Sequence, residues 1–441
     1  MDGTPHAERL AKGGGMTDLI TETVFTWGAP PIKFGAGALD ELYHDLGDFG
    51  ADAVLIVTDR GVAATGIPER VRSQLGDSGF KAEIFEGVSV EPTDESFRDA
   101  AEFAKGSEWD AFVAIGGGSS IDTAKAVNLL TTHPDDLMAY VNKPIGDGKA
   151  PPGPLKPLVA VPTTAGTGSE STPVCIMDIL SMKVKTGISH PRLRPSLAVV
   201  DPLTTLTMPP QVTAACGMDV LCHALESYTA KPYDAYPRKA PEKRAAYCGS
   251  NPISDMWAEK SLELIASSFR TAVMSGYHLK ARTDMMLAAT FAGLGFGNAG
   301  VHIPHACGYP IAGGVETYRP AGYSAVHPLV PHGQSVSVTA PESFRFTYPA
   351  DPARHVRAAE LLGADPFTSG AEEAELLPEA VVRLMQDIEI PNGVAAFGYD
   401  ETHVAALAEG AMKQQRLLSL TPRDVTQEDL EAILKASMRN W

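Results

Sequence analysis

Two side chains that can bind metal stand four residues apart, Asp219 and His223. On a helix this spacing places a carboxylate and an imidazole on one face, a single turn apart. The segment favours a helix, because Pro209 and Pro210 suit a helix start and alanine and leucine follow. A carboxylate combined with imidazoles suits a hard divalent ion such as Fe(II). A simple Asp–His hydrogen bond explains the pair equally well, so the rest of the chain must decide.

More imidazoles follow in two segments where loops meet predicted helices. Residues 297–313 contain His302 and His305, and a later segment contains His327 and His332. A single histidine in such a place is more often a core or capping residue than a ligand. Added to the Asp–His pair, these four give six nitrogen and oxygen candidates in one half of the chain. Their number favours a metal site.

A glycine-rich turn joins a predicted strand to a predicted helix. It consists of Gly116, Gly117, Gly118 and Ser119, with Asp122 one turn later. Glycine lets the backbone approach a ligand, and the free N–H groups at a helix start attract an anion. We therefore predict that this turn binds the pyrophosphate of a dinucleotide. The pattern is neither GxGxxG nor a Walker A loop, so a purely structural turn is the alternative.

A second polar loop follows a later predicted strand. Residues 162–170 include Thr163, Thr164 and Ser169, together with two glycines. So many hydroxyl groups exceed what a simple connection needs. We predict that this loop also contacts the cofactor.

Asp59 and Lys185 are further cofactor candidates. Asp59 follows an early predicted strand, where a carboxylate in dinucleotide-binding folds hydrogen-bonds the ribose and favours NAD over NADP. A turn-forming aspartate is the alternative. Lys185 precedes a turn containing proline, from which it would either reach the ribose on the nicotinamide side or remain a solvated charge.

The pattern of strands and helices divides the chain in two. Short β-branched runs alternate with helical patterns up to about residue 205, which predicts an α/β Rossmann-like domain with a mostly parallel sheet. Later residues have almost no strand signal and predict an all-helical domain. We expect a disordered leader over residues 1–15, the α/β domain over 16–205 and the helical domain over 206–441.

The expected elements are short strands and longer helices. Strands are predicted at 53–57, 82–85, 111–115, 158–161 and 197–200. Helices are predicted at 66–78, 94–107, 120–131, 210–229, 252–275, 280–297, 353–362, 375–388, 400–412 and 426–437. Residues 230–251 and 314–331 are predicted to be long loops, which in a compact domain are usually functional or mobile.

Composition narrows the class of protein. A formal net charge of −18 argues against a nucleic-acid-binding surface. The five cysteines are dispersed and lack CxxC spacing, which predicts reduced thiols and a cytoplasmic location. No apolar run approaches the roughly 20 residues of a membrane span, so no membrane association is expected.

Together these segments resemble the iron-containing (group III) alcohol dehydrogenase family from about Thr23 onward. The resemblance rests on the motifs quoted above and three others, namely Asp201-Pro202, Gly217-x-Asp-x-x-x-His-Ala-x-Glu226 and Pro331-His-Gly333. In this order the set is highly specific. It implies a Rossmann-like domain and a helical domain, the architecture shared with dehydroquinate synthase. NAD and a divalent metal would bind in the cleft between the two domains.

The resemblance also assigns roles to single residues. It places metal ligands at Asp219, His223, His332 and a histidine in the 302–305 region. The sequence departs here from the family's usual pair of histidines four apart, and alignment from the flanking residues favours His305 over His302. Fe(II) is the expected metal, and Zn(II) is compatible with the same ligands. Tyr309 or His302 is the candidate to relay the proton that the alcohol releases.

The 230–251 segment and the long gap before His332 make the chain most similar to the hydroxyacid–oxoacid transhydrogenase branch. That branch passes hydride from a hydroxyacid such as 4-hydroxybutyrate to an oxoacid such as 2-oxoglutarate. A substrate carboxylate would require a cation, and basic residues of the 230–251 segment are candidates, although a solvated charge run is the simpler interpretation. These basic residues are Lys231, Arg238, Lys239, Lys243 and Arg244.

Other functions fit the sequence less well. An ordinary alcohol dehydrogenase that releases NADH after each turnover is the nearest alternative. A lyase of the dehydroquinate synthase type would need a basic phosphate site that the sequence does not display. A non-catalytic nucleotide-binding protein would leave the metal ligands without a role. The expected partners are small hydroxyacids, oxoacids or alcohols, and the chain is expected to form a homo-oligomer.

Overall fold

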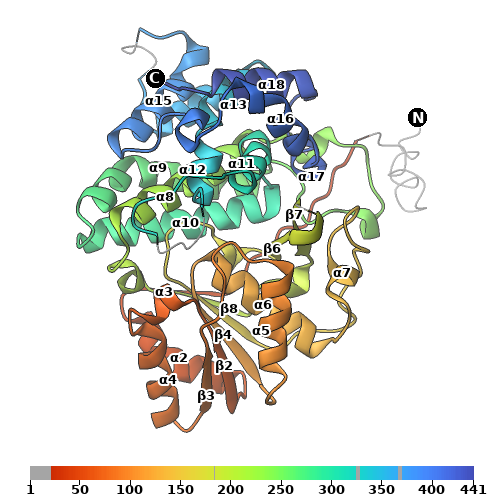
Figure 1. The fold of residues 1–441 in the computed structure, drawn as a ribbon, viewed down its shortest axis with the longest axis vertical. Coiled ribbons are helices and arrows are strands. Elements are labelled where there is room, and N and C mark those ends of the chain that lie inside the picture. Colours follow the sequence, from red (N-terminus) through yellow and green to blue (C-terminus); the bar gives the residue numbers. More distant parts are fainter. Residues whose placement is uncertain (1–20, 183, 324–327, 366–369) are drawn as a thin grey trace, which may run out of the picture.

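Two halves of different architecture make up the described part of the chain. The computed structural model describes residues 21–182, 184–323, 328–365 and 370–441. An α/β half precedes a helical half, which confirms the predicted fold class (Figure 1). The last parallel strand ends at Val200 and the first long helix begins at Pro210, on either side of the predicted domain boundary. The predicted leader and His327 lie outside the described residues.

Six strands form the central sheet, in the order β1-β8-β5-β4-β2-β3. Every pairing in it is parallel. The strands are β1 (Ile32–Phe34), β2 (Ala53–Val57), β3 (Lys81–Phe85), β4 (Ala111–Gly116), β5 (Leu158–Pro162) and β8 (Leu197–Val200). β4 and β5 are buried along their whole length, which explains their continuous apolar sequences.

Helices cover both faces of this sheet (Figure 1). They are α2 (Leu42–Asp48), α3 (Arg60–Ala63), α4 (Ile67–Asp77), α5 (Asp94–Ala104) and α6 (Gly118–Thr132), while α7 (Leu137–Tyr140) packs beside α6 away from the sheet. Neighbouring side chains on β2 point to opposite faces. Ile56 packs in one buried cluster with Leu46 of α2 and Leu75 of α4. Leu55 packs in another with Ala100 of α5 and Ile121 of α6.

An antiparallel hairpin, which the sequence did not predict, lies between the sheet and the helical half (Figure 1). It consists of β6 (Val174–Ile179) and β7 (Val184–Ser189). Asp178 pairs with Lys185 in its register. The hairpin therefore places an acidic and a basic side chain next to each other at the junction of the two halves.

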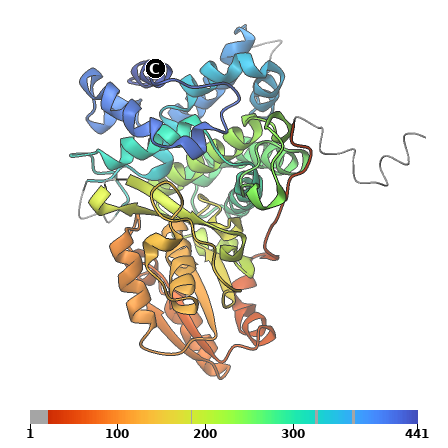
Figure 2. The ribbon, with the colours of Figure 1, turned by 90° about the vertical axis from the view of Figure 1, so that its right-hand side faces the viewer.

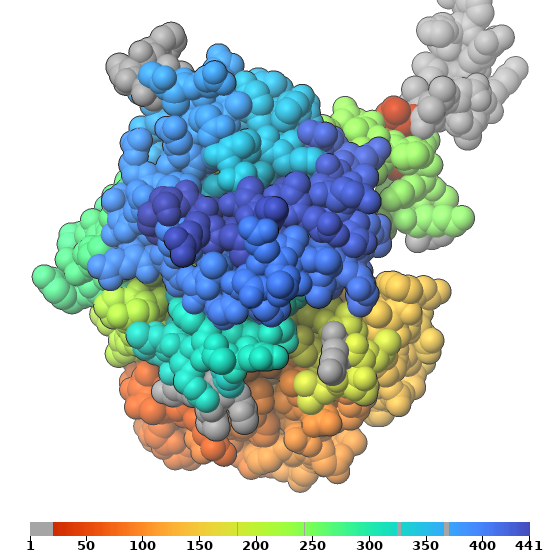
Figure 3. Space-filling view, turned by 45° about the horizontal axis from the view of Figure 1, so that its top comes forward, coloured from red at the N-terminus to blue at the C-terminus, as the bar shows by residue number. Residues whose placement is uncertain are grey.

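The helical half is built around α8 (Pro210–Thr229), which is buried over most of its length. α9 (Pro252–Met274) and α10 (Leu279–Ala299) pack against it in one apolar cluster. The later helices complete this half, and the C-terminal ones among them form the blue surface in Figure 3. The later helices are α11 (Ile303–Gly313), α12 (His332–Ser337), α13 (Ala340–Thr347), α14 (Pro352–Leu361), α15 (Glu373–Asp387), α16 (Val404–Met412), α17 (Gln415–Leu418) and α18 (Gln427–Ala436).

The 230–251 segment is irregular, as predicted, and holds the N-terminal described residues against the helical half. The Glu22 N–H donates to the Tyr236 carbonyl at 2.7 Å. Arg244 forms an ion pair with the Glu22 carboxylate at 3.2 Å. The N-terminal segment then runs along the helical half towards the sheet (Figure 2). The N-terminal end of the α/β half is thus tied to the helical half.

None of the single helices in the described part of the chain is long and apolar enough to cross a membrane. α10 and α11 pass the test of length and composition only as a pair, with a bend of 104° between them. Both helices contribute to the buried core of the helical half.

Candidate active site

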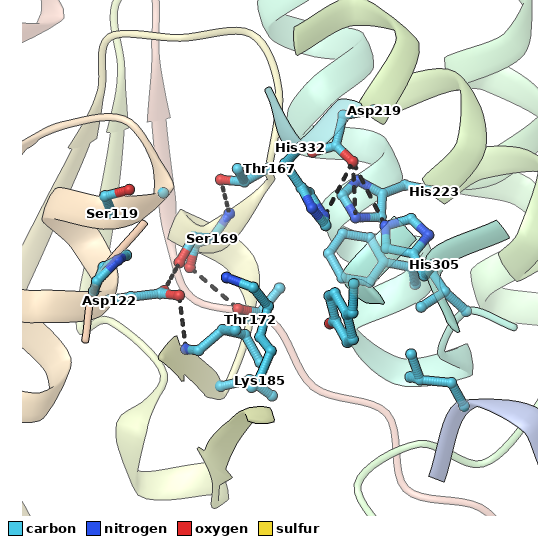
Figure 4. Close-up of a pocket in the computed structure, with 18 of the residues that line it drawn as sticks. Ser119, Asp122, Thr167, Ser169, Thr172, Lys185, Asp219, His223, His305 and His332 are labelled. Carbon is cyan, nitrogen blue, oxygen red and sulfur yellow. Dashed lines mark hydrogen bonds and ion pairs between the residues drawn. The ribbon is translucent and has the colours of Figure 1, made fainter. Parts of the chain in front are cut away.

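A carboxylate and three imidazoles converge where the helical half faces the α/β half (Figure 4). Asp219 Oδ1 lies 3.5 Å from His305 Nε2, 3.7 Å from His223 Nε2 and 3.8 Å from His332 Nε2. Among the described residues, ligand atoms of Asp219, His305 and His332 lie within 4.8 Å of one another. His223 also belongs to this group, because its Nε2 lies near the same oxygen, Asp219 Oδ1. All four predicted ligands are therefore neighbours.

Three helices bring these ligands together. α8 carries Asp219 and His223 one turn apart, α11 carries His305 in its first turn, and α12 begins at His332. α12 approaches α8 so closely that a Cβ atom on Gly333 would lie 1.8 Å from the Ala215 carbonyl oxygen. Only glycine permits that approach. Gly333 therefore allows His332 to face Asp219.

Glu226, two turns after Asp219 on α8, orients His305. Its Oε1 accepts hydrogen bonds from the backbone N–H groups of His302 at 2.8 Å and His305 at 3.2 Å. Its Oε2 lies 2.5 Å from His305 Nδ1. A carboxylate only accepts hydrogen bonds, so Nδ1 carries the hydrogen. Nε2 is then left free to face Asp219, as a metal ligand requires.

Two of the buried atoms at this site that lack hydrogen-bond partners among the described residues lie 3.5 Å apart. They are Asp219 Oδ1 and His305 Nε2. Buried polar atoms are normally paired, because an unpaired one carries a desolvation cost. A divalent cation between them would pair both, and the mixed oxygen and nitrogen donors suit Fe(II) or Zn(II). The residues present therefore fit a metal.

The histidine ligands differ in their protonation before a metal binds. Burial lowers the pKa of His223 to about 3, so its ring is neutral at pH 7. Burial would also lower the pKa of His305, but the charges of Glu226 and Asp219 raise it to about 9. Burial would raise the pKa of Asp219, yet the surrounding imidazoles hold it well below its usual range. A cation that binds here must therefore displace a proton from His305.

His302 and Tyr309 occupy different environments. His302 is fully buried, and its Nε2 lies 3.0 Å from Thr229 Oγ1. It does not line the pocket beside the four ligands, whereas Tyr309 does. The Tyr309 ring stacks near His332 with 5.9 Å between ring centroids. Of the two predicted proton relays, the structure brings only Tyr309 to the site.

The two polar loops of the α/β half pack against each other at the ends of β4 and β5. The Thr163 N–H donates to the Gly116 carbonyl at 3.0 Å. A Cβ atom on Gly117 would lie 3.2 Å from Thr164 Oγ1. Thr163 and Thr164 are thus in contact with the glycine turn, which starts α6. Free N–H groups at that helix start can hold a phosphate.

Asp122 and Ser169 hold these loops together while they face the pocket. Ser169 Oγ donates to Asp122 Oδ1 at 2.5 Å, and the Ile176 N–H donates to Oδ2 at 2.9 Å. Gly118, Ser119, Asp122 and Ser169 all line the pocket. Asp122 therefore connects α6 to the second loop and to β6. Its role as a direct cofactor contact stays a prediction.

Asp59 and Lys185 are both tied into the protein. Asp59 caps α3 by accepting from the Val62 N–H at 3.0 Å, and its other oxygen lies 3.3 Å from Ser120 Oγ beside the glycine turn. Lys185 lines the pocket but is only 7% exposed at its side chain. Its ammonium group pairs with Glu91 at 2.7 Å and Asp178 at 3.0 Å. The solvated alternative for Lys185 was wrong.

One pocket receives side chains from both halves (Figure 4). Ser119, Asp122 and Ser169 face it from the α/β half, and the imidazole cluster faces it from the helical half. Such a pocket can hold a dinucleotide against the turn with its reactive end beside a bound metal. This geometry suits hydride transfer to or from an alcohol.

Comparison with known proteins identifies the family. The model of iron-containing alcohol dehydrogenases matches residues 29–202, and the C-terminal model of the Fe-containing alcohol dehydrogenase family matches residues 245–438. The chain belongs to the iron-containing alcohol dehydrogenase family. As a member of this family it is an oxidoreductase that acts on small molecules with a metal and an NAD-type cofactor.

Curated relatives place the chain in the hydroxyacid–oxoacid transhydrogenase branch of the family. The mitochondrial hydroxyacid-oxoacid transhydrogenases of Bos taurus and Homo sapiens are 45% and 44% identical to it over 438 aligned residues, with 98% of this chain and 94% of each relative covered. The Xenopus laevis protein is 46% identical, and the alignment covers 96% of this chain and 92% of that protein. These relatives are named as mitochondrial proteins. The predicted cytoplasmic location was therefore wrong.

Solved structures of family members share the fold. A 1,3-propanediol oxidoreductase is 31% identical with a TM-score of 0.81, over 94% of this chain and all of its own. The alcohol dehydrogenase from Oenococcus oeni is 28% identical with a TM-score of 0.80 and the same coverage. A sulfoacetaldehyde reductase from Bifidobacterium kashiwanohense, solved with NAD+, is 26% identical with a TM-score of 0.78, over 94% and 99%.

Three residues at the site were not predicted as functional. Glu226 stood in the quoted motif, and its spacing of seven residues from Asp219 could have indicated the same helix face. Tyr247 and Arg416 line the pocket from the 230–251 segment and from α17. No local pattern in the sequence marked either of them.

Proposed function

We propose that this chain transfers hydride from a small hydroxyacid such as 4-hydroxybutyrate to an oxoacid such as 2-oxoglutarate. The observation that carries this proposal is the pocket in which the Asp–His cluster faces the glycine turn. The likeness to three transhydrogenases over almost the whole chain supports the choice of substrates. NAD would accept the hydride from one substrate and return it to the other.

We propose Asp219, His223, His305 and His332 as the ligands of Fe(II), with Zn(II) compatible. A divalent metal in this position supplies Lewis acidity, which lowers the pKa of a substrate hydroxyl. The glycine turn and the 162–170 loop would hold the cofactor so that the nicotinamide faces the substrate carbon. Asp59 would receive the adenosine-side ribose.

We propose Tyr309 as a relay for the proton that the hydroxyl loses. Burial raises the pKa of the Tyr309 hydroxyl to about 12, so it remains protonated at neutral pH. A protonated hydroxyl passes one proton on while it accepts another, and thus acts as a relay instead of a base. The predicted homo-oligomer and the expected absence of nucleic-acid and membrane partners stay predictions.

The proposed reaction is tested by omitting free cofactor. Enzyme loaded with Fe(II) and NAD+ and then desalted should convert 4-hydroxybutyrate and 2-oxoglutarate into succinic semialdehyde and 2-hydroxyglutarate in equal amounts, over many turnovers. Mass spectrometry measures both products. An ordinary alcohol dehydrogenase would stop after one turnover of its bound NAD+, and it would form further NADH only when NAD+ is added. That result would overturn the transhydrogenase proposal while leaving the family assignment intact.

Replacing Glu226 with glutamine should weaken metal binding by about 10- to 100-fold, the usual effect of losing a group that orients a ligand. The glutamine oxygen can still accept from the two backbone N–H groups. Its amide nitrogen would face His305 Nδ1, which must then accept, so the ring hydrogen moves to Nε2. That tautomer cannot bind metal.

A competition titration with a metal chelator measures this change. Glu259→Gln is the matched control, because Glu259 also contacts α8, through Tyr228 Oη at 2.9 Å, but does not line the pocket. Equal metal affinity in the two variants would contradict the role assigned to Glu226.

A further inference from the structure

The proposed substrates carry a carboxylate, yet four of the five basic residues of the 230–251 segment make contacts elsewhere. Arg244 pairs with Glu22, and Arg238 donates to Thr23 Oγ1 at 3.0 Å. Lys231 and Lys239 both lie over the Tyr236 ring, at 5.1 Å and 5.6 Å from its centroid. None of the five predicted candidates is among the described residues that line the pocket. The carboxylate must therefore meet another cation.

Among the described residues that line the pocket, the permanent cations are Lys185 and Arg416. Lys185 already has two acidic partners, Glu91 and Asp178. Arg416 forms no ion pair with any acidic side chain of the described residues. It is exposed while it lines the pocket, which places it at an opening to solvent. Arg416 is thus the uncompensated positive charge of the pocket.

Arg416 is held in place by two groups from distant parts of the chain. Its Nη1 donates to Ser189 Oγ on β7 at 2.8 Å. Its guanidinium lies over the Tyr247 ring, 5.1 Å from the centroid, as a cation–π contact. The backbone beside Tyr247 is itself fixed, because the Cys248 N–H donates to the Asn298 carbonyl at 2.8 Å. The blue C-terminal part borders the yellow part of the α/β half on the surface (Figure 3).

Arg416 lies on α17, which packs against α11, the helix that carries Tyr309 and His305. Its charge acts on the hydroxyl of Tyr309, opposing the rise in pKa that burial causes. The Tyr309 ring in turn stacks near His332. Arg416, Tyr309 and His332 therefore line one and the same pocket. A short molecule with a carboxylate at one end and a hydroxyl at the other matches this arrangement.

We propose that Arg416 is the specificity-determining residue that binds the substrate carboxylate remote from the reacting carbon. Tyr247 and Ser189 are positioning residues for its guanidinium. A guanidinium presents parallel N–H donors that match the two oxygens of a carboxylate. The inference rests on the proposed function. It also gives the 230–251 segment a role, because that segment supplies the Tyr247 ring.

The test compares acidic with neutral substrates in Arg416→Gln. KM for 4-hydroxybutyrate and for 2-oxoglutarate should rise about 10- to 100-fold, the range expected for one charge-assisted hydrogen-bonded pair. In 1,4-butanediol a hydroxymethyl group replaces the carboxylate. With this substrate kcat/KM should change less than about threefold, well below the change that the loss of one charged hydrogen bond causes. Arg416→Lys should recover part of the loss, and Tyr247→Leu should raise KM for the acids without changing kcat.

Calorimetry of 2-oxoglutarate binding to the metal- and NADH-loaded enzyme provides a readout apart from turnover. The matched control is Arg423→Gln, because Arg423 lies over the Phe346 ring at 4.1 Å but does not line the pocket. Suppose that the wild-type enzyme transfers hydride between the acids, and that Arg416→Gln keeps the wild-type KM for both acids and the wild-type affinity for 2-oxoglutarate. In that case only the role of Arg416 is overturned. If wild type oxidises the diol but neither acid reacts, the proposed function and this inference both fail.

Discussion

Asp219→Asn should lose most of its bound metal and about 10³-fold or more in kcat/KM, because Lewis-acid assistance contributes several kcal/mol to such reactions. Asp219 Oδ1 lies within 3.8 Å of the Nε2 atoms of His223, His305 and His332. Asparagine keeps the shape of the side chain but removes the negative charge. A neutral amide oxygen binds a hard cation more weakly than a carboxylate does.

Elemental analysis of the purified variant, followed by steady-state kinetics with saturating Fe(II), checks this prediction. Asp284→Asn is a suitable control, because Asp284 is also a buried carboxylate of the helical half, bonded to Lys280 and Ser268, and does not line the pocket. The control should retain its metal. Full metal content in Asp219→Asn, with kcat/KM within about tenfold of wild type, would show that the cluster does not bind the catalytic metal.

The parts of the fold that were predicted correctly have a strong local signal. β4 is a continuous apolar run, and α8 combines a proline start with a long apolar stretch, so strand and helix follow from neighbouring residues alone. The glycine turn was predicted because a glycine cluster between such elements has few other uses. Asp219 and His223 were found for the same reason, since one helix fixes their spacing.

The helices that carry the other two ligands were missed, because their sequences disfavour a helix locally. α11 contains Pro304, Gly308 and Pro310. Tertiary packing explains the glycine, since a Cβ atom on Gly308 would lie 2.8 Å from Val336 Cγ2 of α12. Close packing between α11 and α12 thus overrides helix propensity. The clustering of histidines made His305 and His332 candidates, and the family motifs then selected them as ligands.

Contacts between distant segments could not be predicted from local patterns. Lys185 is neutralised by Glu91 and by Asp178, which the β6–β7 hairpin brings beside it. Arg416 lies in a helix of four residues and meets Ser189, 227 residues earlier in the sequence. In the sequence each appears as an isolated charge in a polar segment. Only the folded chain separates a compensated cation from a free one.

Lys125→Met should lower the free energy of unfolding by about 3–5 kcal/mol, the cost of removing one partner from a buried charged network. The Lys125 side chain is fully buried. Its ammonium group donates to the carbonyl oxygens of Ser169 and Val174 at 2.7 Å, and to Thr172 Oγ1 at 3.1 Å. Methionine preserves the length of the side chain, but it leaves these acceptors without this donor and removes the positive charge 3.5 Å from the Asp122 carboxylate.

Urea denaturation measures the change in the free energy of unfolding. The control is Lys260→Met, which removes an exposed lysine that pairs with Glu263. For this control we expect a change within about 0.5 kcal/mol. A double variant with Asp122→Asn should recover part of the loss, because it also removes the unpaired buried charge. NADH affinity should fall in Lys125→Met, since Ser169 belongs to the loop proposed to hold the cofactor. If Lys125→Met and Lys260→Met unfold at the same urea concentration, the buried lysine does not hold that loop in place. Stability and cofactor binding are expected to decline together, because one ammonium group joins α6, the 162–170 loop and β6.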